Sequence, residues 1–303
     1  LVGSEMCIRD STGAGPNGIT GKLIREKLAN EYMILAPSSK ELDLTNDDIV
    51  NRFFENNKID YVIHCATFRP LHNTTKHFVD DILESNLRMY FTLARQSKHY
   101  KKMIYFGSGA EYAKTSGIIN VKEENVGREI PKDQYGFGKY IMNEHARNSD
   151  NIYNLRLFGT INPYERCSKN VISNICAKAI CSNKINLQKN CKFSFVDMDD
   201  VINIIKRILR ENLQYHDFNI TSGKVFYLSE IAEIISNISG KHNPVFFENE
   251  GLNLEYTGSN ERIINQLRNF KFTEIADSLE KVYDYYYQNQ ALIDIDKLDS
   301  RWK

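Results

Sequence analysis

The stretch Thr12–Gly21 reads TGAGPNGITG, and it decides the expected fold. Its glycines fit two spacings, either GxGxxG on Gly13, Gly15 and Gly18 or GxxGxxG on Gly15, Gly18 and Gly21. We favour the second, because the apolar residues Leu23, Ile24 and Leu28 then begin a helical face after the last glycine. Such a loop lets the backbone approach the pyrophosphate of a dinucleotide at a helix N-terminus. An ordinary turn is the alternative, so the loop needs support from the rest of the chain.

Short apolar runs alternate with amphipathic stretches after this loop. Strands are expected at 32–36, 60–66, 103–106 and 154–158, and helices after Thr45, which is expected to cap the first, and at 78–98 and 135–147. This alternation is typical of βαβ units and predicts an α/β fold with a doubly wound parallel sheet of the Rossmann type. After Gly159 the pattern loosens, and Asp199 or Asp200 is expected to cap a helix at 201–209. We expect a Rossmann domain over 12–162 plus 193–223 and a smaller interleaved lobe over 163–192 plus 224–303.

The first residues are a special case. Leu1–Asp10 reads LVGSEMCIRD and resembles translated adapter sequence from environmental sequencing. A buried parallel strand should precede the glycine loop as a nearly continuous apolar run, but Met6–Ile8 leads directly into Arg9 and Asp10. We therefore expect residues 1–11 to be a non-native segment outside the fold, with the native first strand missing.

The composition excludes several classes of protein. Lys plus Arg and Asp plus Glu number 39 each in 303 residues, so no net charge favours nucleic acid or an anionic membrane. No apolar run approaches the roughly 20 residues of a membrane span, and no secretory signal is visible. The histidines show no HxH or HExxH spacing, so no metal is expected. Six cysteines without a CxxC pair indicate reduced thiols and a cytoplasmic protein.

The choice of cofactor depends on the end of the strand at 32–36. A proline, Ser38, Ser39 and Lys40 follow that strand, and the first acid is Glu41. Hydroxyl groups and a lysine suit the additional phosphate of NADP, which a carboxylate would repel. A solvated polar turn has the same composition. We expect NADP(H) rather than NAD(H).

The stretch Tyr135–Lys139 reads YGFGK and carries the expected chemistry. On a helix, positions four apart share a face, so the Lys139 ammonium can lie below the Tyr135 phenol. A tyrosine has a pKa of about 10 in water, and a nearby cation lowers it toward the range in which the phenol donates a proton. Chance alone produces about one such pair in a chain of this composition. Ser108 in FGSGAEY follows another strand, where its hydroxyl can hold a substrate oxygen, although a serine in such a turn is common.

Together these motifs resemble the extended short-chain dehydrogenase/reductase family, in particular its NAD-dependent epimerase/dehydratase branch. The resemblance runs from about Ser11 to Leu279 and rests on the ordered motifs GPNGITG, ELDLTN, YVIHCAT, FGSGAEY, YGFGK, LRLFG, FSFVDMDDV and FNITSGK. It implies a catalytic triad of Ser108, Tyr135 and Lys139, and a nucleotide-sugar site in the smaller lobe.

The resemblance and the motifs together give a set of expected contacts. The expected cofactor residues are Gly15, Gly18, Ile19, Ser38, Ser39, Lys40, Asp43, Leu44, Cys65, Ala66, Thr67, Asn86, Tyr135, Lys139 and Phe158. The expected substrate residues are Ser108, Glu111 and Asn170. Related enzymes commonly pair through the two helices at 78–98 and 135–147, so we expect a homodimer. The resemblance also implies a role in bacterial cell-surface polysaccharide synthesis.

Departures from the family pattern narrow the expected reaction. Nucleotide-sugar dehydratases of this family carry an Asp-Glu pair after the triad hydroxyl, where this chain has Gly109 and Ala110. Fucose-synthase-like epimerase-reductases use a Cys and a His, and the matching positions here are Ala110 and Asn170. Hydride transfer at a single carbon remains, as reduction of a 4-keto sugar with NADPH or as C4 epimerisation with retained NAD. The alternative of another class is a non-catalytic NADP-binding redox sensor.

Overall fold

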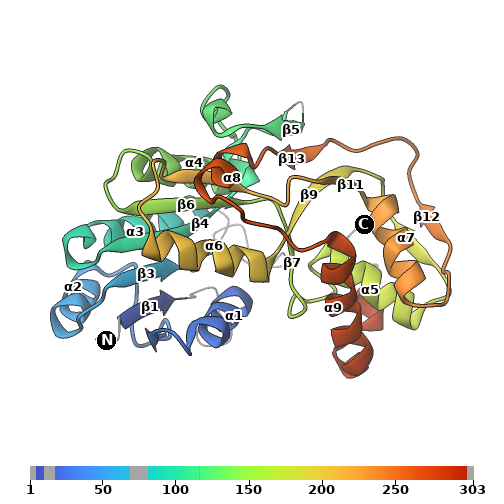
Figure 1. Cartoon of the computed structure of the whole chain (residues 1–303), viewed down its shortest axis with the longest axis horizontal. Coiled ribbons are helices and arrows are strands. Elements are labelled where there is room, and N and C mark those ends of the chain that lie inside the picture. The colour runs from blue at the N-terminus through green and yellow to red at the C-terminus, as the bar shows by residue number, and fades with distance from the viewer. Residues whose placement is uncertain (1–4, 10–17, 69–80, 116, 299–303) are drawn as a thin grey trace. The chain divides into compact units, whose positions relative to one another are not determined.

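The computed structural model describes residues 5–9, 18–68, 81–115 and 117–298. They divide into two compact units whose segments interleave along the chain, as the colours of Figure 1 show. Unit 1 takes Leu1–Lys114, Lys122–Arg156 and Ile202–Asn219, and unit 2 takes Thr115–Val121, Leu157–Val201 and Ile220–Lys303. The boundaries expected at 162/163 and 192/193 are therefore wrong, because the strands near 160 and 195 pair with each other in a sheet of unit 2.

Unit 1 has the predicted doubly wound architecture. Its sheet has the strand order β10-β6-β4-β3-β1-β2, with β1 (Glu5–Arg9), β2 (Met33–Leu35), β3 (Tyr61–His64), β4 (Lys102–Ser108), β6 (Ile152–Leu157) and β10 (Asp217–Ile220). The chain passes from β1 outward to β2 and then returns to the other side of β1 for β3, which pairs in parallel with both β1 and β4. A ligand of such a sheet binds at this switch point, beyond the carboxyl ends of β1 and β3.

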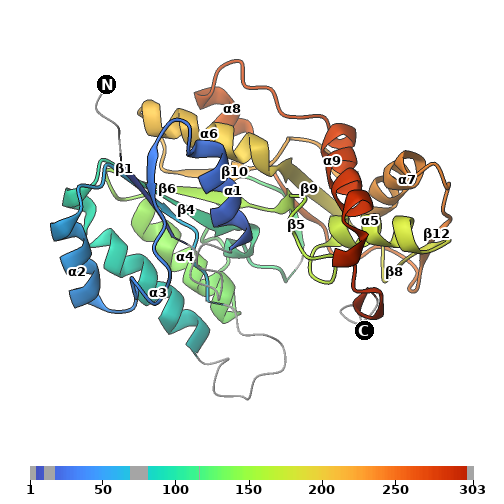
Figure 2. The ribbon, with the colours of Figure 1, turned by 90° about the horizontal axis from the view of Figure 1, so that it is seen from below.

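Helices cover both faces of this sheet (Figure 2). They are α1 (Ile19–Leu28), α2 (Asp47–Asn56), α3 (Asp81–Ala94), α4 (Gln134–Ala146) and α6 (Met198–Arg210). One core cluster joins α2, α3 and α4 to β3 and β4, and Tyr90 and Tyr105 lie fully buried in it with their ring centres 5.0 Å apart. The rigid pairing of α3 with α4 fixes the helix that carries the YGFGK motif.

The first strand contradicts the expectation that residues 1–11 lie outside the fold. β1 pairs in parallel with β2, with Cys7 opposite Leu35, and with β3, with Cys7 opposite Val62. Parallel pairing uses only backbone N–H and C=O groups, so the polar residues around the apolar run do not prevent it. The position before the glycine loop, which we expected to be missing, is therefore filled.

Two helix caps also differ from the predicted ones. The side chain of Asn46, and not Thr45, caps α2 by accepting the Ile49 N–H at 3.1 Å. At α6 the Asp197 carboxylate accepts the Asp199 N–H at 2.8 Å, so the helix begins at Met198 and neither Asp199 nor Asp200 caps it. At α2 the capping residue directly follows the predicted Thr45 and has the extended backbone of an N-cap, whereas at α6 the capping Asp197 lies two residues before Asp199.

The described residues of unit 2 form two smaller sheets and several helices. One sheet has the order β11-β9-β13-β5 with β7 beside β9, and the other pairs β12 with β8. The strands are β5 (Ile118–Val121), β7 (Gly159–Ile161), β8 (Ile185–Leu187), β9 (Lys192–Asp197), β11 (Val225–Tyr227), β12 (Val245–Phe247) and β13 (Tyr256–Gly258). The helices are α5 (Val171–Cys181), α7 (Leu228–Ile238), α8 (Glu261–Gln266) and α9 (Ile275–Gln288).

The core of unit 2 packs α5, α7 and α9 together and takes up several of the cysteines. Burial raises the pKa of the Cys176 thiol and raises that of Cys191 to about 11, so both stay protonated and serve as small apolar residues. Within the part of the chain that the structure describes, every helix is too short or too polar to cross a bilayer.

Candidate active site

Ser108 lies where the central strand β4 ends in a tight turn. The turn is a short 3₁₀ helix, η3 (Gly109–Glu111), and Ser108 is its N-cap. The Ser108 hydroxyl accepts the Ala110 N–H at 3.2 Å, and the Glu111 carboxylate accepts the Ser108 N–H at 3.1 Å. This reciprocal capping box fixes the half-buried serine at the carboxyl edge of the sheet, where ligands bind.

Tyr135 and Lys139 lie on the first turns of α4, whose N-cap Asp133 accepts the Gly136 N–H at 2.8 Å. The Lys139 side chain is only 4% exposed and donates from Nζ to the carbonyl oxygen of Phe106 at 2.7 Å. Its ammonium lies 5.9 Å from the centre of the Tyr135 ring. The structure thus brings the lysine to the tyrosine and ties it to the strand that ends in Ser108.

The two glycines of YGFGK explain how closely α4 approaches its neighbours. A Cβ atom on Gly136 would lie 2.4 Å from the carbonyl oxygen of Ala110, in the turn that follows Ser108. A Cβ atom on Gly138 would lie 3.2 Å from Cδ1 of Leu83 on α3. Gly136 therefore permits direct backbone contact between the helix of Tyr135 and the turn of Ser108, which no side chain would leave room for.

Glu111 does not face a substrate, so its expected role as a sugar contact is wrong. The side chain is fully buried, and its carboxylate accepts hydrogen bonds from the Ser108 N–H, from Asn154 and from Arg156 Nε, the last at 2.6 Å. Burial raises the pKa of Glu111, and the Arg156 guanidinium opposes that rise. Every contact donates toward the carboxyl group, which is the pattern of an ionised carboxylate.

Some of the residues expected to hold the cofactor lie at the start of α1 and directly after β3, next to the switch point of the sheet. Gly15 lies outside the described residues. Gly18 is buried and is the N-cap of α1, and none of the described side chains caps this helix, so the end of α1 fits the pyrophosphate of a dinucleotide. Ile19 begins the helix, and Cys65, Ala66 and Thr67 directly follow β3. These residues fit an NAD(P) cofactor.

Asn86 on α3 forms hydrogen bonds with the segment that follows β3. Its side chain is 4% exposed and forms two hydrogen bonds with Phe68, accepting the N–H at 2.8 Å and donating to the carbonyl oxygen at 3.0 Å. A third bond joins it to the carbonyl oxygen of Ile82. Asn86 therefore holds the end of the segment 65–68 on α3, and the cofactor contact expected of it stays a prediction.

The turn after β2 contains the carboxylate of Glu41, which in the sequence is too far from the end of the strand to be expected in a cofactor site. Glu41 folds back three residues, and its Oε2 atom accepts the Ser38 N–H at 2.6 Å. That hydrogen bond lowers the pKa of Glu41, so the group is charged near neutral pH. Ser39 and Lys40 are exposed beside it. A negative charge therefore shares the turn that was expected to receive the phosphate of NADP.

The remaining predicted residues have structural contacts of their own. Asp43 accepts the N–H and hydroxyl of Thr45, and Leu44 is buried in the core of unit 1. In unit 2, the Phe158 ring packs on Gly258 and lies 5.3 Å from the Tyr256 ring, and Asn170 is the N-cap of α5. The contacts of Phe158 with cofactor and of Asn170 with substrate stay predictions.

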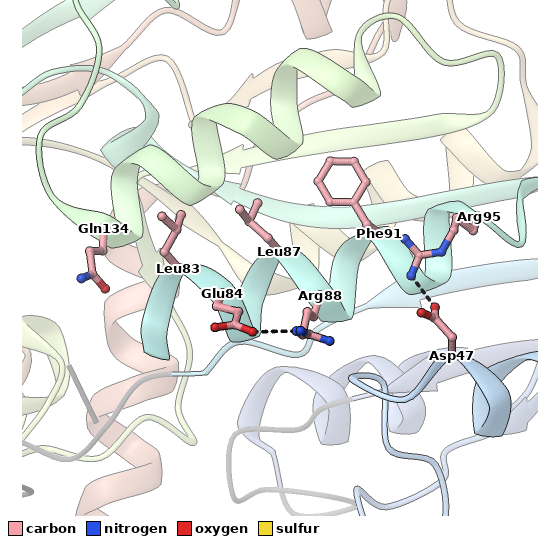
Figure 3. A pocket seen from close by; sticks show the side chains of 8 residues that line it. All are labelled: Asp47, Leu83, Glu84, Leu87, Arg88, Phe91, Arg95 and Gln134. Atoms are coloured by element: carbon pink, nitrogen blue, oxygen red, sulfur yellow. Dashed lines mark hydrogen bonds and ion pairs between the residues drawn. The ribbon is translucent and has the colours of Figure 1, made fainter. Parts of the chain in front are cut away.

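A surface hollow of about 670 Å³ lies along α3 in unit 1 (Figure 3). The half-buried side chains of Leu83, Leu87 and Phe91 form an apolar strip along it. Two ion pairs, Arg88 with Glu84 and Arg95 with Asp47, border the strip. The hollow is lined by residues other than the triad, and its apolar strip is the surface on which pairing through α3 was predicted.

Comparisons with known proteins identify the family of this chain and several proteins that are similar to it. The family model described as "NAD dependent epimerase/dehydratase family" matches residues 14–221, more than half of the chain. A GDP-6-deoxy-D-talose 4-dehydrogenase of Aggregatibacter actinomycetemcomitans is 24% identical over 294 residues, which cover 89% of this chain and 95% of that protein.

Two solved structures share the fold. A GDP-mannoheptose C4 reductase from Campylobacter jejuni with NADP bound aligns with a TM-score of 0.75 at 21% identity, over 94% of this chain and 99% of that one. A GDP-L-fucose synthetase from Naegleria fowleri bound to NADP aligns with a TM-score of 0.76 at 16% identity, over 96% of each chain.

Proposed function

Because this chain belongs to the NAD dependent epimerase/dehydratase family, we propose that it transfers hydride at C4 of a GDP-linked sugar, in the favoured direction as a 4-keto reductase. The observation that carries the proposal is the attachment of all three triad residues to one segment. Lys139 bonds to Phe106, Ser108 ends the same strand, and Gly136 next to Tyr135 packs on Ala110. The GDP-sugar relatives support the substrate class.

Each of the three side chains has a distinct task in this proposal. The bound nicotinamide cofactor supplies the hydride. Tyr135 donates the proton to the sugar oxygen, since its phenol is the acidic group of the triad. The buried Lys139 ammonium favours the phenolate form of Tyr135 by electrostatic attraction. The Ser108 hydroxyl orients the same oxygen, because its position is fixed by the capping box.

The proposed cofactor is NADPH. Ser38 is half-buried and Ser39 and Lys40 are exposed, so hydroxyl groups and a cation are available to a phosphate. Glu41 occupies the Ser38 N–H and has to turn away when that phosphate binds. The relatives of known structure that carry NADP support the same choice.

The carboxylate of Glu41 favours a second candidate, a C4 epimerase with tightly held NAD. A carboxylate near the end of the second strand accepts hydroxyl groups of the NAD ribose in related folds. An epimerase returns the hydride to the same sugar, so it keeps its cofactor, whereas a reductase must exchange it after each turnover.

The homodimer, the cytoplasmic location and a role in polysaccharide synthesis complete the proposal. The apolar strip on α3 supports the dimer, since a surface of this kind is buried when two copies pair. Unit 2 is the proposed sugar-nucleotide lobe. Sedimentation of the wild type and of Leu87→Asp tests the dimer, which this change should dissociate.

A nucleotide titration followed by a hydride-transfer assay tests the function. We expect NADPH to bind at least tenfold more tightly than NADH, a difference of about 1.4 kcal/mol, and to be oxidised by a GDP-4-keto-sugar. NAD that co-purifies with the protein, together with interconversion of GDP-sugars without net oxidation, would establish the epimerase instead. Failure of every nicotinamide nucleotide to bind would contradict both candidates.

A further inference from the structure

A fully buried set of polar side chains lies under the turn of Ser108. We call Glu111, Asn143, Asn154 and Arg156 the Arg156 network; the side chains of all four are 0% exposed. Charged groups are rarely buried so completely, because the loss of hydration is large unless every group finds a partner. Neither the chemistry proposed above nor the packing of the sheet requires a charge at this place.

The network joins the two elements that carry the triad. Arg156 donates from Nε to Glu111 at 2.6 Å and from Nη2 to Asn143 Oδ1 at 2.8 Å. Glu111 in turn accepts the N–H of Ser108. Asn143 lies on α4 four residues after Lys139, so one guanidinium connects the turn of Ser108 to the helix of Tyr135 and Lys139.

Asn154 completes the connection from the neighbouring position on β6. Its amide nitrogen donates to Asn143 Oδ1 at 2.8 Å and to both carboxylate oxygens of Glu111, at 3.1 and 3.0 Å. The backbone of Gly107 packs directly on this network. A Cβ atom on Gly107 would lie only 2.2 Å from Glu111 Oε1, so a side chain at this position would collide with the carboxylate. The network therefore lies in direct contact with the strand segment that ends in Ser108.

We propose that Glu111, Asn143 and Arg156 are positioning residues, which set the separation between Ser108 and the Tyr135–Lys139 pair. The inference rests on the proposed function, since it assigns these residues a part in that reaction. A proton donor and an oxygen-holding hydroxyl must act on one substrate atom, and a misplacement of about 1 Å costs roughly a hundredfold in rate. A buried network with directional bonds holds such a distance more closely than apolar packing does.

The first variant is Asn143→Ala, which removes the acceptor on α4 but leaves the Glu111–Arg156 pair intact. We expect kcat to fall about a hundredfold with little change in the dissociation constant of NADPH. In the protein without cofactor, hydrogen exchange should accelerate at residues 106–111 and 134–140. Asn143→Asp keeps an acceptor oxygen in the same place and should restore most of kcat.

The matched control is Lys102→Met, at the opposite end of β4. Lys102 is also buried, and its amine donates to the carbonyl oxygens of Ile208 at 2.6 Å and Glu211 at 2.7 Å. Its loss should lower the melting temperature without lowering kcat. If Asn143→Ala loses no more kcat than Lys102→Met at a matched loss of melting temperature, the network is only structural and the inference is overturned.

A second variant separates folding from positioning. Glu111→Leu and Arg156→Met are combined with Asp217→Asn, because Arg156 pairs with both buried carboxylates; this replaces the ion pairs by uncharged groups, a change that buried pairs often tolerate without loss of stability. We expect this protein to keep its melting temperature and to lose kcat by the same factor as Asn143→Ala. Full kcat in this variant would overturn the inference.

The exchange experiment keeps the inference testable if the proposed function fails. Should the wild type transfer no hydride to any GDP-sugar, the function is wrong and kcat has no meaning. Hydrogen exchange at residues 106–111 is then the only measurement that tests whether the network couples the turn to the helix. Faster exchange in Asn143→Ala than in Lys102→Met supports the coupling of turn and helix, and equal exchange overturns it.

Discussion

The ammonium group of Lys139 has two kinds of neighbour, and they limit what it can do. It donates to the carbonyl oxygen of Phe106 at 2.7 Å, and it lies 5.8 Å from the Tyr105 ring and 5.9 Å from the Tyr135 ring. The bond to Phe106 fixes the ammonium, while the distance to Tyr135 leaves its effect on that phenol electrostatic. In the proposed reaction Lys139 therefore acts on Tyr135 as a fixed positive charge in a buried setting.

Tyr135→Phe removes the proposed proton donor and keeps the ring. We expect kcat to fall by about 10²- to 10⁴-fold, while NADPH binding is retained because the Lys139 site is unchanged. Steady-state kinetics and a fluorescence titration of NADPH measure the two effects. Tyr140→Phe on the same helix is the control and should keep full activity. An unchanged kcat in Tyr135→Phe would show that Tyr135 is not the proton donor.

Glu41→Gln removes the charge that shares the turn with Ser38. Since the Glu41 carboxylate accepts the Ser38 N–H and repels a phosphate, its neutral analogue should bind NADPH severalfold more tightly and leave NADH binding nearly unchanged. Calorimetric titration with both nucleotides gives the ratio. Glu55→Gln on α2 removes an exposed charge from another element and serves as the control. A ratio that falls in Glu41→Gln would show that Glu41 assists NADPH binding.

The triad residues could be predicted from the sequence, because their places depend on residues close to them along the chain. Tyr135 and Lys139 are four positions apart, and Ser108 directly follows an apolar strand, so local rules bring each to its place. The partnership of Glu111 with Arg156 could not be predicted, because it joins residues 45 positions apart through the order of strands. One signal was present: an arginine inside the buried strand segment NLRLF calls for a buried anion.

At the scale of elements, the site depends on the contact between α4 and the turn of Ser108. The helix touches that turn with its backbone at Gly136 and touches α3 at Gly138. The Gly138 contact involves the flexible end of a leucine side chain, whereas the Gly136 contact involves a carbonyl oxygen that has nowhere to move. The two glycines of one motif should therefore differ in how well they tolerate a methyl group.

Gly136→Ala should displace α4 from the turn and lower stability by about 1–3 kcal/mol, with a loss of kcat. Gly138→Ala is the matched control: Leu83 can adjust, and alanine favours the helix by up to about 1 kcal/mol over glycine. Thermal unfolding of both variants beside the wild type gives the comparison. Equal losses of stability would contradict the close contact at Ala110.

The order of elements in unit 1 was predicted more accurately than the boundaries of the units. Hydrophobic periodicity identified strands and helices up to Phe158, because each is a local pattern. It missed β1, whose short apolar run is set among polar residues, and β5, which is only four residues long. It also misplaced the unit boundaries, since no local pattern shows that β7 and β9 pair with each other in a second sheet.

At the scale of the whole molecule, ion pairs between distant segments add a dependence on pH. Glu31, which follows α1, pairs with Lys206 at 2.6 Å and with Arg210 at 2.5 Å on α6. These partners, Lys206 first, lower the pKa of Glu31 below its ordinary value of 4.5. A carboxylate whose pKa is lower in the folded than in the unfolded protein stabilises the fold at any pH above its unfolded pKa. That contribution disappears as the pH falls through its folded pKa.

Glu31→Gln should cost under about 1 kcal/mol near neutral pH, because the pair is largely exposed. The difference from the wild type should decrease at an acidic pH below the ordinary value of 4.5, because the paired carboxylate loses its charge as the pH falls. Melting temperatures at the two pH values test this. Glu26→Gln breaks a longer pair of 3.9 Å with Lys22 and should have a smaller effect. A difference that persists in acid would show that Glu31 acts through packing.

The partners of Arg156 also bear on how the chain is made. Its guanidinium donates to Glu111 and Asn143, which are synthesised before it, and also to Asp217 and Asn219, which leave the ribosome more than sixty residues later. A nascent chain that ends before β10 therefore holds a buried cation with part of its acceptors missing and an open edge on β6. The active-site turn reaches its final rigidity only when translation has passed Asn219, so premature termination before that point leaves a species for chaperones and proteases to remove.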